Sequence, residues 1–369
     1  MVIGVPKETK EDEYRVALVP SGAAALRRAG HTVLVQSRAG SGSAVVDREY
    51  AQAGAEVVES AAGLYRQAQL ILKVKEPLPG EYDRLRAGQI LFTFFHFAAN
   101  KPLAQAMLKR KVTCIAYETV EDAQGQLPIL IPMSEVAGRM AVQEGAKYLE
   151  KPMKGKGILL GGIPGVAPAN VLILGGGVVG ANAAKVAAGL GAEVTVMDLN
   201  LDRLRYLEDI MPHVSFLMSN EHNVVDRIGR ADLVVLAALI RGARSPILIP
   251  RWMLKRMKPG SVLVDVAIDQ GGCAETSRPT THAAPIFVEE GVVHYCVTNI
   301  PGAVPISSTY GLTNATLPFA LEIANLGLAR ALKKRPALAQ GVNIARGKVV
   351  YRSLAQALGQ PYSPLQRFL

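Results

Sequence analysis

Four polar residues follow apolar, strand-like runs and could act on a small molecule: Arg15, Lys75, His96 and Asp269. Open α/β sheets bind ligands outside the carboxyl ends of their strands, so polar residues at these positions are candidates for a site. A guanidinium such as that of Arg15 can hold a carboxylate through two parallel hydrogen bonds. The ammonium of Lys75, which closes the run Leu70 to Lys75, could polarise a carbonyl group.

His96 and Asp269 are candidates for proton transfer. An imidazole has an unperturbed pKa of about 6.5, which suits proton exchange near neutral pH. Asp269 follows the apolar run 262–267, and two glycines come after it, so its carboxylate should face a cofactor cleft. The residues alone leave three alternatives open: a surface arginine in a charged loop, a histidine satisfied in the core, and an aspartate that caps a turn.

A glycine cluster between two β-branched runs predicts a dinucleotide site. The run 171–174 leads into Gly175, Gly177 and Gly180, an alanine-rich helical segment follows, and a second run ends at Asp198. In this βαβ fingerprint the first glycine allows a sharp turn, the second admits a pyrophosphate, and the third lets the helix pack near the sheet. The alternative is an ordinary glycine-rich turn between a strand and a helix.

Asp198 favours NAD over NADP as the cofactor. A carboxylate at the end of the second strand can accept hydrogen bonds from the ribose hydroxyls and would repel a 2′-phosphate. The nearest downstream cation, Arg203, lies a full helical turn further on. Residues 157–184 carry no charge, but their glycines and prolines argue against a membrane span.

Composition excludes several classes of protein. The chain has 369 residues, is 49% hydrophobic and carries a net charge of +10, with the basic residues scattered rather than interleaved with aromatics. We therefore expect no nucleic-acid partner. Six dispersed histidines predict no metal site. Three cysteines without CxxC spacing and the absence of a signal-peptide pattern predict a reduced, cytoplasmic protein.

Alternation of apolar runs with helical segments predicts an α/β fold with two Rossmann-like, doubly wound domains. In the first domain we expect strands at 2–5, 32–35, 55–58, 70–74, 90–95 and 112–116, with helices at 21–30 and 47–54. In the second, further strands are expected at 214–217, 233–238 and 261–267, with helices at 223–229 and 251–257.

Two long helical patterns should join the domains. The first, 135–150, has Ser134 as its expected N-cap, and the second runs from 309 to 332. The segments after the second pattern should complete the first domain, which is then discontinuous in sequence. We predict a substrate domain of residues 1–131 and 306–369 and an NAD-binding domain of residues 132–305.

The chain resembles the alanine dehydrogenase and nicotinamide nucleotide transhydrogenase family. The resemblance covers nearly the whole chain. It is carried by the motifs at 4–8, 15–18, 73–77, 132–135, 175–180, 264–272, 277–281, 299–305 and 313–316.

The resemblance implies reversible oxidative deamination of L-alanine with NAD, giving pyruvate and ammonia, by a homohexamer. Arg15 and Lys75 would then grip pyruvate, while His96 and Asp269 would carry protons and activate water or ammonia. Which of these two is the principal base stays open. The cofactor contacts implied by the resemblance come from Ser134, Val178, Asp198, Ser219 and Asn299.

Two departures from the family pattern are visible. The segment around the histidine reads Phe94-Phe-His-Phe97 where Tyr-Leu-His-Leu is expected, and Ile306 stands where a basic residue is usual. Three other functions stay open: a saccharopine-type or N-alkyl amino acid dehydrogenase, a transhydrogenase subunit serving a membrane-bound partner, and a catalytically silent NAD-binding regulator. The joint presence of Arg15, Lys75 and His96 speaks against a transhydrogenase subunit.

Overall fold

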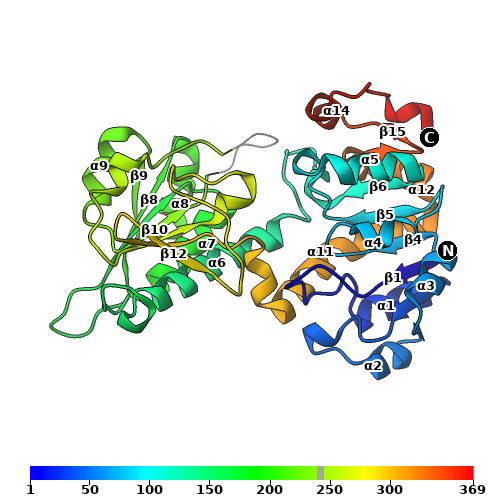
Figure 1. Ribbon diagram of the computed structural model, residues 1–369, viewed down its shortest axis with the longest axis horizontal. Helices are drawn as coiled ribbons and strands as arrows, with labels where there is room; N and C mark the ends of the chain where they lie inside the picture. Colours follow the sequence, from blue (N-terminus) through cyan, green and yellow to red (C-terminus); the bar gives the residue numbers. More distant parts are fainter. Residues whose placement is uncertain (239–244, 369) are drawn as a thin grey trace. The chain divides into compact units, whose positions relative to one another are not determined.

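The computed structural model describes residues 1–238 and 245–368 (Figure 1). The chain forms two compact units: unit 1 contains Met1–Met133 and Gly302–Leu369, and unit 2 contains Ser134–Pro301. Each unit is built on a mostly parallel sheet flanked by helices. The predicted class of two Rossmann-like α/β units is therefore confirmed.

Unit 1 has an eight-stranded sheet in the order β15-β14-β6-β5-β4-β1-β2-β3. The pairs among β1 to β6 are parallel, whereas β14 runs antiparallel to both β6 and β15. The chain's last strands thus extend the sheet begun by its first residues. The strands are β1 (Val2–Val5), β2 (Thr32–Gln36), β3 (Glu56–Val58), β4 (Leu70–Leu72), β5 (Ile90–Thr93), β6 (Thr113–Ala116), β14 (Val342–Ala345) and β15 (Lys348–Val349).

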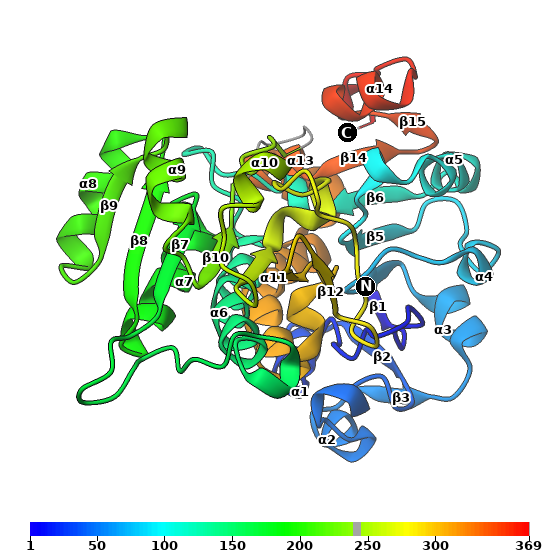
Figure 2. The same ribbon diagram turned by 60° about the vertical axis from the view of Figure 1, so that its left-hand side comes forward.

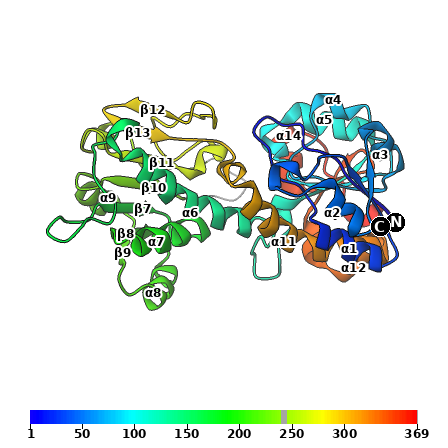
Figure 3. The ribbon, with the colours of Figure 1, turned by 90° about the horizontal axis from the view of Figure 1, so that it is seen from below.

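Helices cover both faces of this sheet (Figure 3), which explains why its central strands β4, β5 and β6 are buried along their whole length. One face carries α3 (Ala61–Gln67), α4 (Pro79–Tyr82), α5 (Lys101–Arg110) and α14 (Arg352–Leu358). The other carries α1 (Pro20–Arg28), α11 (Pro305–Leu326) and α12 (Leu328–Lys334). Two short helices, α2 (Asp47–Gln52) and α13 (Pro336–Gln340), lie in the connections.

Unit 2 has a seven-stranded sheet in the order β12-β13-β11-β10-β7-β8-β9, and Figure 2 shows β9, β8, β7 and β10 side by side. In the described part of this unit, β12 pairs antiparallel with β13, and the other neighbouring strands are parallel. The strands are β7 (Asn170–Leu174), β8 (Glu193–Asp198), β9 (Ser215–Met218), β10 (Leu233–Leu236), β11 (Val262–Asp265), β12 (Ile286–Glu289) and β13 (Val292–Tyr295). The helices are α6 (Ile131–Tyr148), α7 (Val178–Gly189), α8 (Leu201–Ile210), α9 (Glu221–Ile228) and α10 (Arg251–Leu254).

Helix α6 packs on unit 2 through glycines. A side chain at Gly138 would run into the carbonyl oxygen of Val179 in α7, and one at Gly145 would lie 2.6 Å from a methyl carbon of Leu233 in β10. The absence of side chains at both positions lets the helix approach the sheet and α7 closely. Met140, Ala141 and Tyr148 of this helix are buried, with Ala141 fully enclosed.

Several strands end earlier than the apolar runs predict. The run predicted as 70–74 forms β4 only to Leu72, because the backbone N–H of Val74 donates to the carboxylate of Glu8 at 2.7 Å. Similarly, β5 stops at Thr93, after which the backbone N–H groups of Phe95 and His96 donate to Glu118. Side-chain carboxylates thus accept N–H groups at these ends, although Phe94 still donates its N–H to the carbonyl of Val74 at 3.2 Å.

The two long helices also differ from prediction. Helix α6 starts at Ile131, so Ser134 lies in its first turn and the prediction of an N-cap there is wrong. The turn from Leu127, whose carbonyl accepts N–H groups of Leu130 and Ile131, leads into the helix earlier. The pattern predicted as 309–332 forms α11 and α12, separated at Gly327 with a φ of 73°. The hairpin of β12 and β13 had no counterpart in the predicted elements.

A buried ion cluster lies at the end of β4 in unit 1. The ammonium of Lys73, which is 1% exposed, lies 3.1 Å from Glu8 Oε2 and 3.2 Å from Glu81 Oε1. Glu81 also accepts the hydroxyl of Tyr65 at 2.7 Å. The neighbouring carboxylates hold the pKa of Lys73 above its usual value although burial opposes its charge. The one ammonium therefore serves two carboxylates, and burial raises the pKa of one of them, Glu8.

Replacing Lys73 with methionine should destabilise unit 1 strongly. The change would leave Glu8 and Glu81 as buried carboxylates without a cation, which typically costs roughly 3–5 kcal/mol. Urea denaturation followed by circular dichroism measures the loss. Lys147→Met, which removes an exposed ion pair with Glu144, is the control and should cost less than about 1 kcal/mol. An equal loss in the free energy of unfolding for the two variants would show that the buried ion cluster contributes no more to stability than an exposed ion pair.

Candidate active site

The fingerprint glycines of unit 2 have the geometry that a pyrophosphate requires. Gly175 has a φ of 107°, and a side chain there would meet the backbone of Ala237 at 2.7 Å. A side chain at Gly180 would collide with the carbonyl oxygen of Gly175, which explains the close approach of α7 to β7. A side chain at Gly177 would meet nothing within 4 Å, so this glycine leaves open space beside the first N–H groups of α7, at Val178. The loop therefore fits a bound dinucleotide.

Asp198 is fixed at the end of β8 by two backbone donors. Its Oδ2 accepts the N–H of Gly176 at 2.6 Å, and its Oδ1 accepts the N–H of Asn200 at 2.8 Å. The carboxylate thus lies directly against the fingerprint loop, where an adenosine ribose would bind.

Arg203 reaches the same loop, although its sequence position suggested a cation one helical turn away. Its Nε donates to the carbonyl oxygen of Gly176 at 2.7 Å, and its guanidinium carbon lies 5.1 Å from the ring centre of Tyr206. A positive and a negative side chain therefore flank one residue of the loop. The position of Arg203 in the sequence did not predict this contact, because Arg203 and Gly176 lie far apart in the chain and meet only in the folded unit.

The other residues expected to contact the cofactor also lie in unit 2. Ser219 follows β9 and donates its N–H to the carbonyl of Asp198 at 2.9 Å, which places its backbone next to Asp198. Ser134 precedes by one helical turn Gly138, the residue that packs on α7. Asn299 has a left-handed backbone with a φ of 61°, and its carbonyl lies 3.2 Å from Nε2 of His282.

Asp269 lies in a short 3-10 helix, Val266–Gln270, at the carboxyl end of β11. Two glycines with positive φ follow it, Gly271 at 98° and Gly272 at 76°. The strand β11 is next to β10, which is next to the fingerprint strand β7. Asp269 therefore lies on the same edge of the sheet as the glycine loop.

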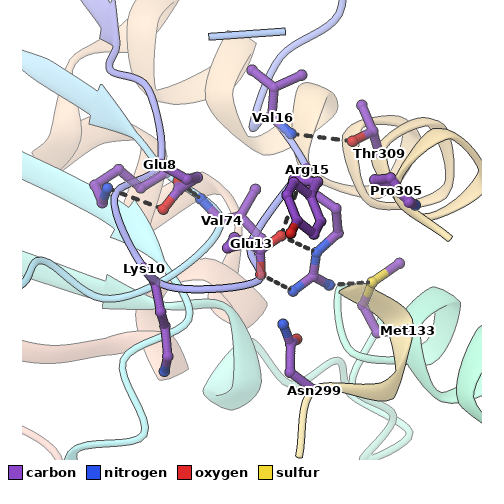
Figure 4. Close-up of polar contacts among 12 residues, drawn as sticks. Glu8, Lys10, Glu13, Arg15, Val16, Val74, Met133, Asn299, Pro305 and Thr309 are labelled. Atoms are coloured by element: carbon purple, nitrogen blue, oxygen red, sulfur yellow. Dashed lines mark hydrogen bonds and ion pairs between the residues drawn. The ribbon is translucent and has the colours of Figure 1, made fainter. Parts of the chain in front are cut away.

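Arg15 lies in unit 1 and is held by a carboxylate that sequence reasoning did not select. Its Nε and one terminal nitrogen donate to the two oxygens of Glu13 at 2.7 and 2.5 Å, and its other terminal nitrogen lies 3.1 Å from the sulfur of Met133 (Figure 4). Both Arg15 and Glu13 are buried. The pKa of Glu13 falls to about 2, because hydrogen bonds and charge from Arg15, together with Lys75, outweigh the burial that opposes ionisation.

Lys75 and Arg15 place positive charge around His96. The pKa of the His96 imidazole is lowered to about 3, by loss of hydration and by repulsion from Lys75, Lys10 and Arg15. The side chain is exposed, so water lessens both the loss of hydration and the repulsion, but both causes lower the pKa. The three residues selected in unit 1 thus share one electrostatic environment, in which the ring is neutral at physiological pH.

The backbone of His96 is itself unusual. Its φ of 50° and ψ of 41° are left-handed, a conformation that residues with a side chain rarely adopt. Glu118, which follows β6, accepts the N–H of His96 at 2.7 Å and that of Phe95 at 3.2 Å. Burial raises the pKa of Glu118, while these donors and Lys75 act in the opposite direction. Glu118 therefore holds the histidine loop.

Phe94 forms one wall beside the histidine. Its ring stacks on the His96 ring with 5.8 Å between centres and 6° between planes, and its edge meets Tyr117. The resemblance led us to expect a tyrosine here, so the chain presents an apolar surface at that point.

The structure groups the predicted residues by unit. Arg15, Lys75 and His96 belong to unit 1, and Asp269 belongs to unit 2 together with the fingerprint. No group of metal-binding side chains occurs within 1–238 and 245–368. Within that part of the chain, every helix is too short or too polar to cross a membrane.

Comparison with known proteins gives consistent matches over the full chain. Residues 4–137 match the family profile described as alanine dehydrogenase/PNT, N-terminal domain, and residues 141–352 match the corresponding C-terminal domain. The alanine dehydrogenase of Methanococcus maripaludis is 53% identical, with 100% of both chains covered. That of Bacillus subtilis is 54% identical over 100% of this chain and 98% of the relative.

Solved structures agree with these matches. An L-alanine dehydrogenase superposes with a TM-score of 0.94 at 48% identity, covering 97% of this chain and 99% of the other. A transhydrogenase from Sinorhizobium meliloti gives a TM-score of 0.81 at 26% identity, covering 95% and 99%.

The cation cluster near His96, formed by Lys75, Lys10 and Arg15, predicts an unusual titration of its imidazole. Its ring should stay neutral from pH 5 to 8, and Lys75→Met should raise its pKa toward the ordinary value of about 6.5. NMR of the imidazole protons measures both. Because the unfolded chain binds the proton more readily, the contribution of His96 to stability should fall as pH drops below about 6.5. An unperturbed titration in the unmodified protein would contradict the electrostatic argument.

Proposed function

Because the chain belongs to the alanine dehydrogenase/PNT family, we propose that it catalyses NAD-dependent, reversible oxidative deamination of L-alanine to pyruvate and ammonia. Membership makes it an oxidoreductase that uses a nicotinamide cofactor. The observation that best supports an amino acid substrate is the cation cluster of Arg15 and Lys75 beside a neutral His96 in unit 1. A transhydrogenase subunit has no need of a site for a small carboxylate.

We assign substrate binding to unit 1 and NAD binding to unit 2. We assign the substrate carboxylate to Lys75 and Arg15, with the bidentate pair between Arg15 and Glu13 fixing the orientation of the guanidinium. The residues assigned to the cofactor are Ser134, Gly175, Gly177, Val178, Gly180, Asp198, Ser219 and Asn299. When bound, the nicotinamide would supply the acceptor for the hydride that leaves the α-carbon of the amino acid.

Side chains of the protein then manage protons and water. Loss of a hydride from the α-carbon and of a proton from the amino group leaves an imine. Water adds to the imine carbon, and the adduct releases ammonia to give the ketone. His96 and Asp269 are assigned these proton transfers, because one is neutral at physiological pH and the other is a carboxylate at the cofactor edge.

Substrate binding should prepare His96 for its role. A bound carboxylate would offset part of the charge of Arg15 and Lys75, which depresses the pKa of the imidazole. The histidine then becomes a better proton acceptor when substrate is present. Pyruvate added during the NMR titration should therefore raise the pKa of His96.

Purified protein should reduce NAD when given L-alanine, seen as absorbance of reduced nicotinamide. His96→Ala and Asp269→Ala should each lower kcat by about 10²- to 10⁴-fold, the usual contribution of a positioned acid or base. The control His213→Ala changes an exposed histidine and should leave the rate unaltered. Serine, glycine, 2-aminobutyrate, saccharopine and N-alkyl amino acids are compared in the same assay. Preference for one of these over alanine, or no reduction at all, would refute the proposal.

The choice of NAD over NADP should depend on Asp198. Asp198→Asn removes the negative charge but keeps an acceptor for Gly176, and Arg203 already lies on the same loop. We expect the variant to improve kcat/KM with NADP by about tenfold or more, since Arg203 can then pair with the 2′-phosphate. Adding Arg203→Leu should cancel the gain. Unchanged preference in Asp198→Asn would show that this carboxylate does not select the cofactor.

The homohexameric state implied by the resemblance and the cytoplasmic location predicted from the cysteines belong to the same proposal. Light scattering of the purified protein tests the first, and fractionation of cells tests the second.

A further inference from the structure

One buried carboxylate, Asp265, holds the turn that carries Asp269. Asp265 is the last residue of β11 and is completely buried. Its Oδ1 accepts the N–H of Ala267 at 3.0 Å. Its Oδ2 accepts the N–H groups of Cys273 at 2.7 Å and Ala274 at 3.3 Å, and the hydroxyl of Ser277 at 2.6 Å. The carboxylate therefore binds both the beginning and the end of the turn.

The turn closes tightly around this carboxylate. A side chain at Gly272 would lie 2.8 Å from Asp265 Oδ2 and 2.8 Å from the Cβ of Ser277. Gly271 and Gly272 both have positive φ, so the backbone returns toward Asp265 in a path that other residues rarely follow. Because both of its ends are fixed to one side chain, the position of Asp269 between them depends on Asp265.

An amide could not replace the carboxylate in this arrangement. Four donors converge on two oxygens, whereas asparagine offers one oxygen and would direct its own N–H groups at other donors. Burial raises the pKa of Asp265, and the four donors oppose that rise. Burying this acid costs free energy that burying an apolar residue would not, and the four hydrogen bonds offset that cost.

We propose that Asp265 is a positioning residue that sets the catalytic geometry of Asp269. The proposal rests on the function assigned above, in which Asp269 moves a proton. Asp265 itself would not touch substrate or cofactor. Small displacements of a reacting group can cost about 100-fold in rate, so loss of this anchor should appear in turnover rather than in binding.

Asp265→Asn tests the proposal, with Asp232→Asn as a matched control. Asp232 is also a buried carboxylate of unit 2; it accepts the N–H of Asn170 at 2.8 Å and pairs with Lys156. It precedes β10, and the pairing of Leu233 with Val262 places it at the opposite end of the sheet. We expect Asp265→Asn to lower kcat about 10- to 100-fold with little change in the dissociation constant of NADH, measured by fluorescence. Asp232→Asn should lower the melting temperature without a comparable loss of kcat.

A double-mutant cycle separates positioning from a general structural role. If Asp265 acts through Asp269, adding Asp265→Asn to Asp269→Asn should lower the residual rate less than about twofold, whereas independent effects would multiply. Should Asp265→Asn fail to fold, Ser277→Ala removes only one donor and replaces it in the cycle, with an expected loss of about fivefold.

The outcomes distinguish the two proposals. Absence of alanine-dependent NAD reduction in the unmodified enzyme would overturn the function itself. An active enzyme in which the losses multiply, or in which Asp265→Asn turns over as fast as Asp232→Asn, would overturn only the positioning role.

Discussion

Carboxylates that accept backbone N–H groups at the ends of strands are the interaction on which this enzyme's loops depend. Glu8 takes the N–H of Val74, Glu118 takes that of His96, and Asp198 takes that of Gly176. Asp265 does the same for the turn after β11. Where a parallel strand leaves its sheet, its N–H groups lose their ladder partners, and a charged acceptor satisfies them more strongly than a neutral one. The loops that carry the proposed site are therefore fixed by hydrogen bonds within the loop as well as by the strands at their two ends.

Charge within unit 1 is arranged in two separate groups. The ammonium of Lys73 pairs with Glu8 and Glu81. The pair with Glu8 holds the loop after β1 against β4. Lys75, two residues later, contributes instead to the potential that keeps His96 neutral. Two lysines of one short segment thus have different tasks because their neighbours differ. The carboxylates beside Lys73 allow it to be buried, whereas Lys75 lowers the pKa of Glu13, opposes the rise in the pKa of Glu118 and repels a proton from His96.

Much of the fold and part of the site could be predicted from sequence, for physical reasons that particular residues illustrate. The fingerprint glycines and Asp198 are close in sequence, and their geometry follows from local backbone requirements. The strand ends at Leu72 and Asp265 were placed too late, because the acceptors that end these strands are side chains whose contacts apolarity does not encode. Glu118 and the reach of Arg203 depend on tertiary contacts, and spacing in the chain carries no signal for either.

The left-handed backbone at His96 has an evolutionary consequence. Glycine and asparagine adopt this conformation at lower cost than histidine. The histidine therefore lowers the free energy of unfolding, and we expect it to be kept only where its imidazole is needed. A descendant released from catalysis would gain stability by exchanging the histidine for either of them. Relatives that have kept the fold but abandoned the reaction should thus be recognisable by a small or amide residue at this one backbone position, even where the fingerprint and the cation cluster persist.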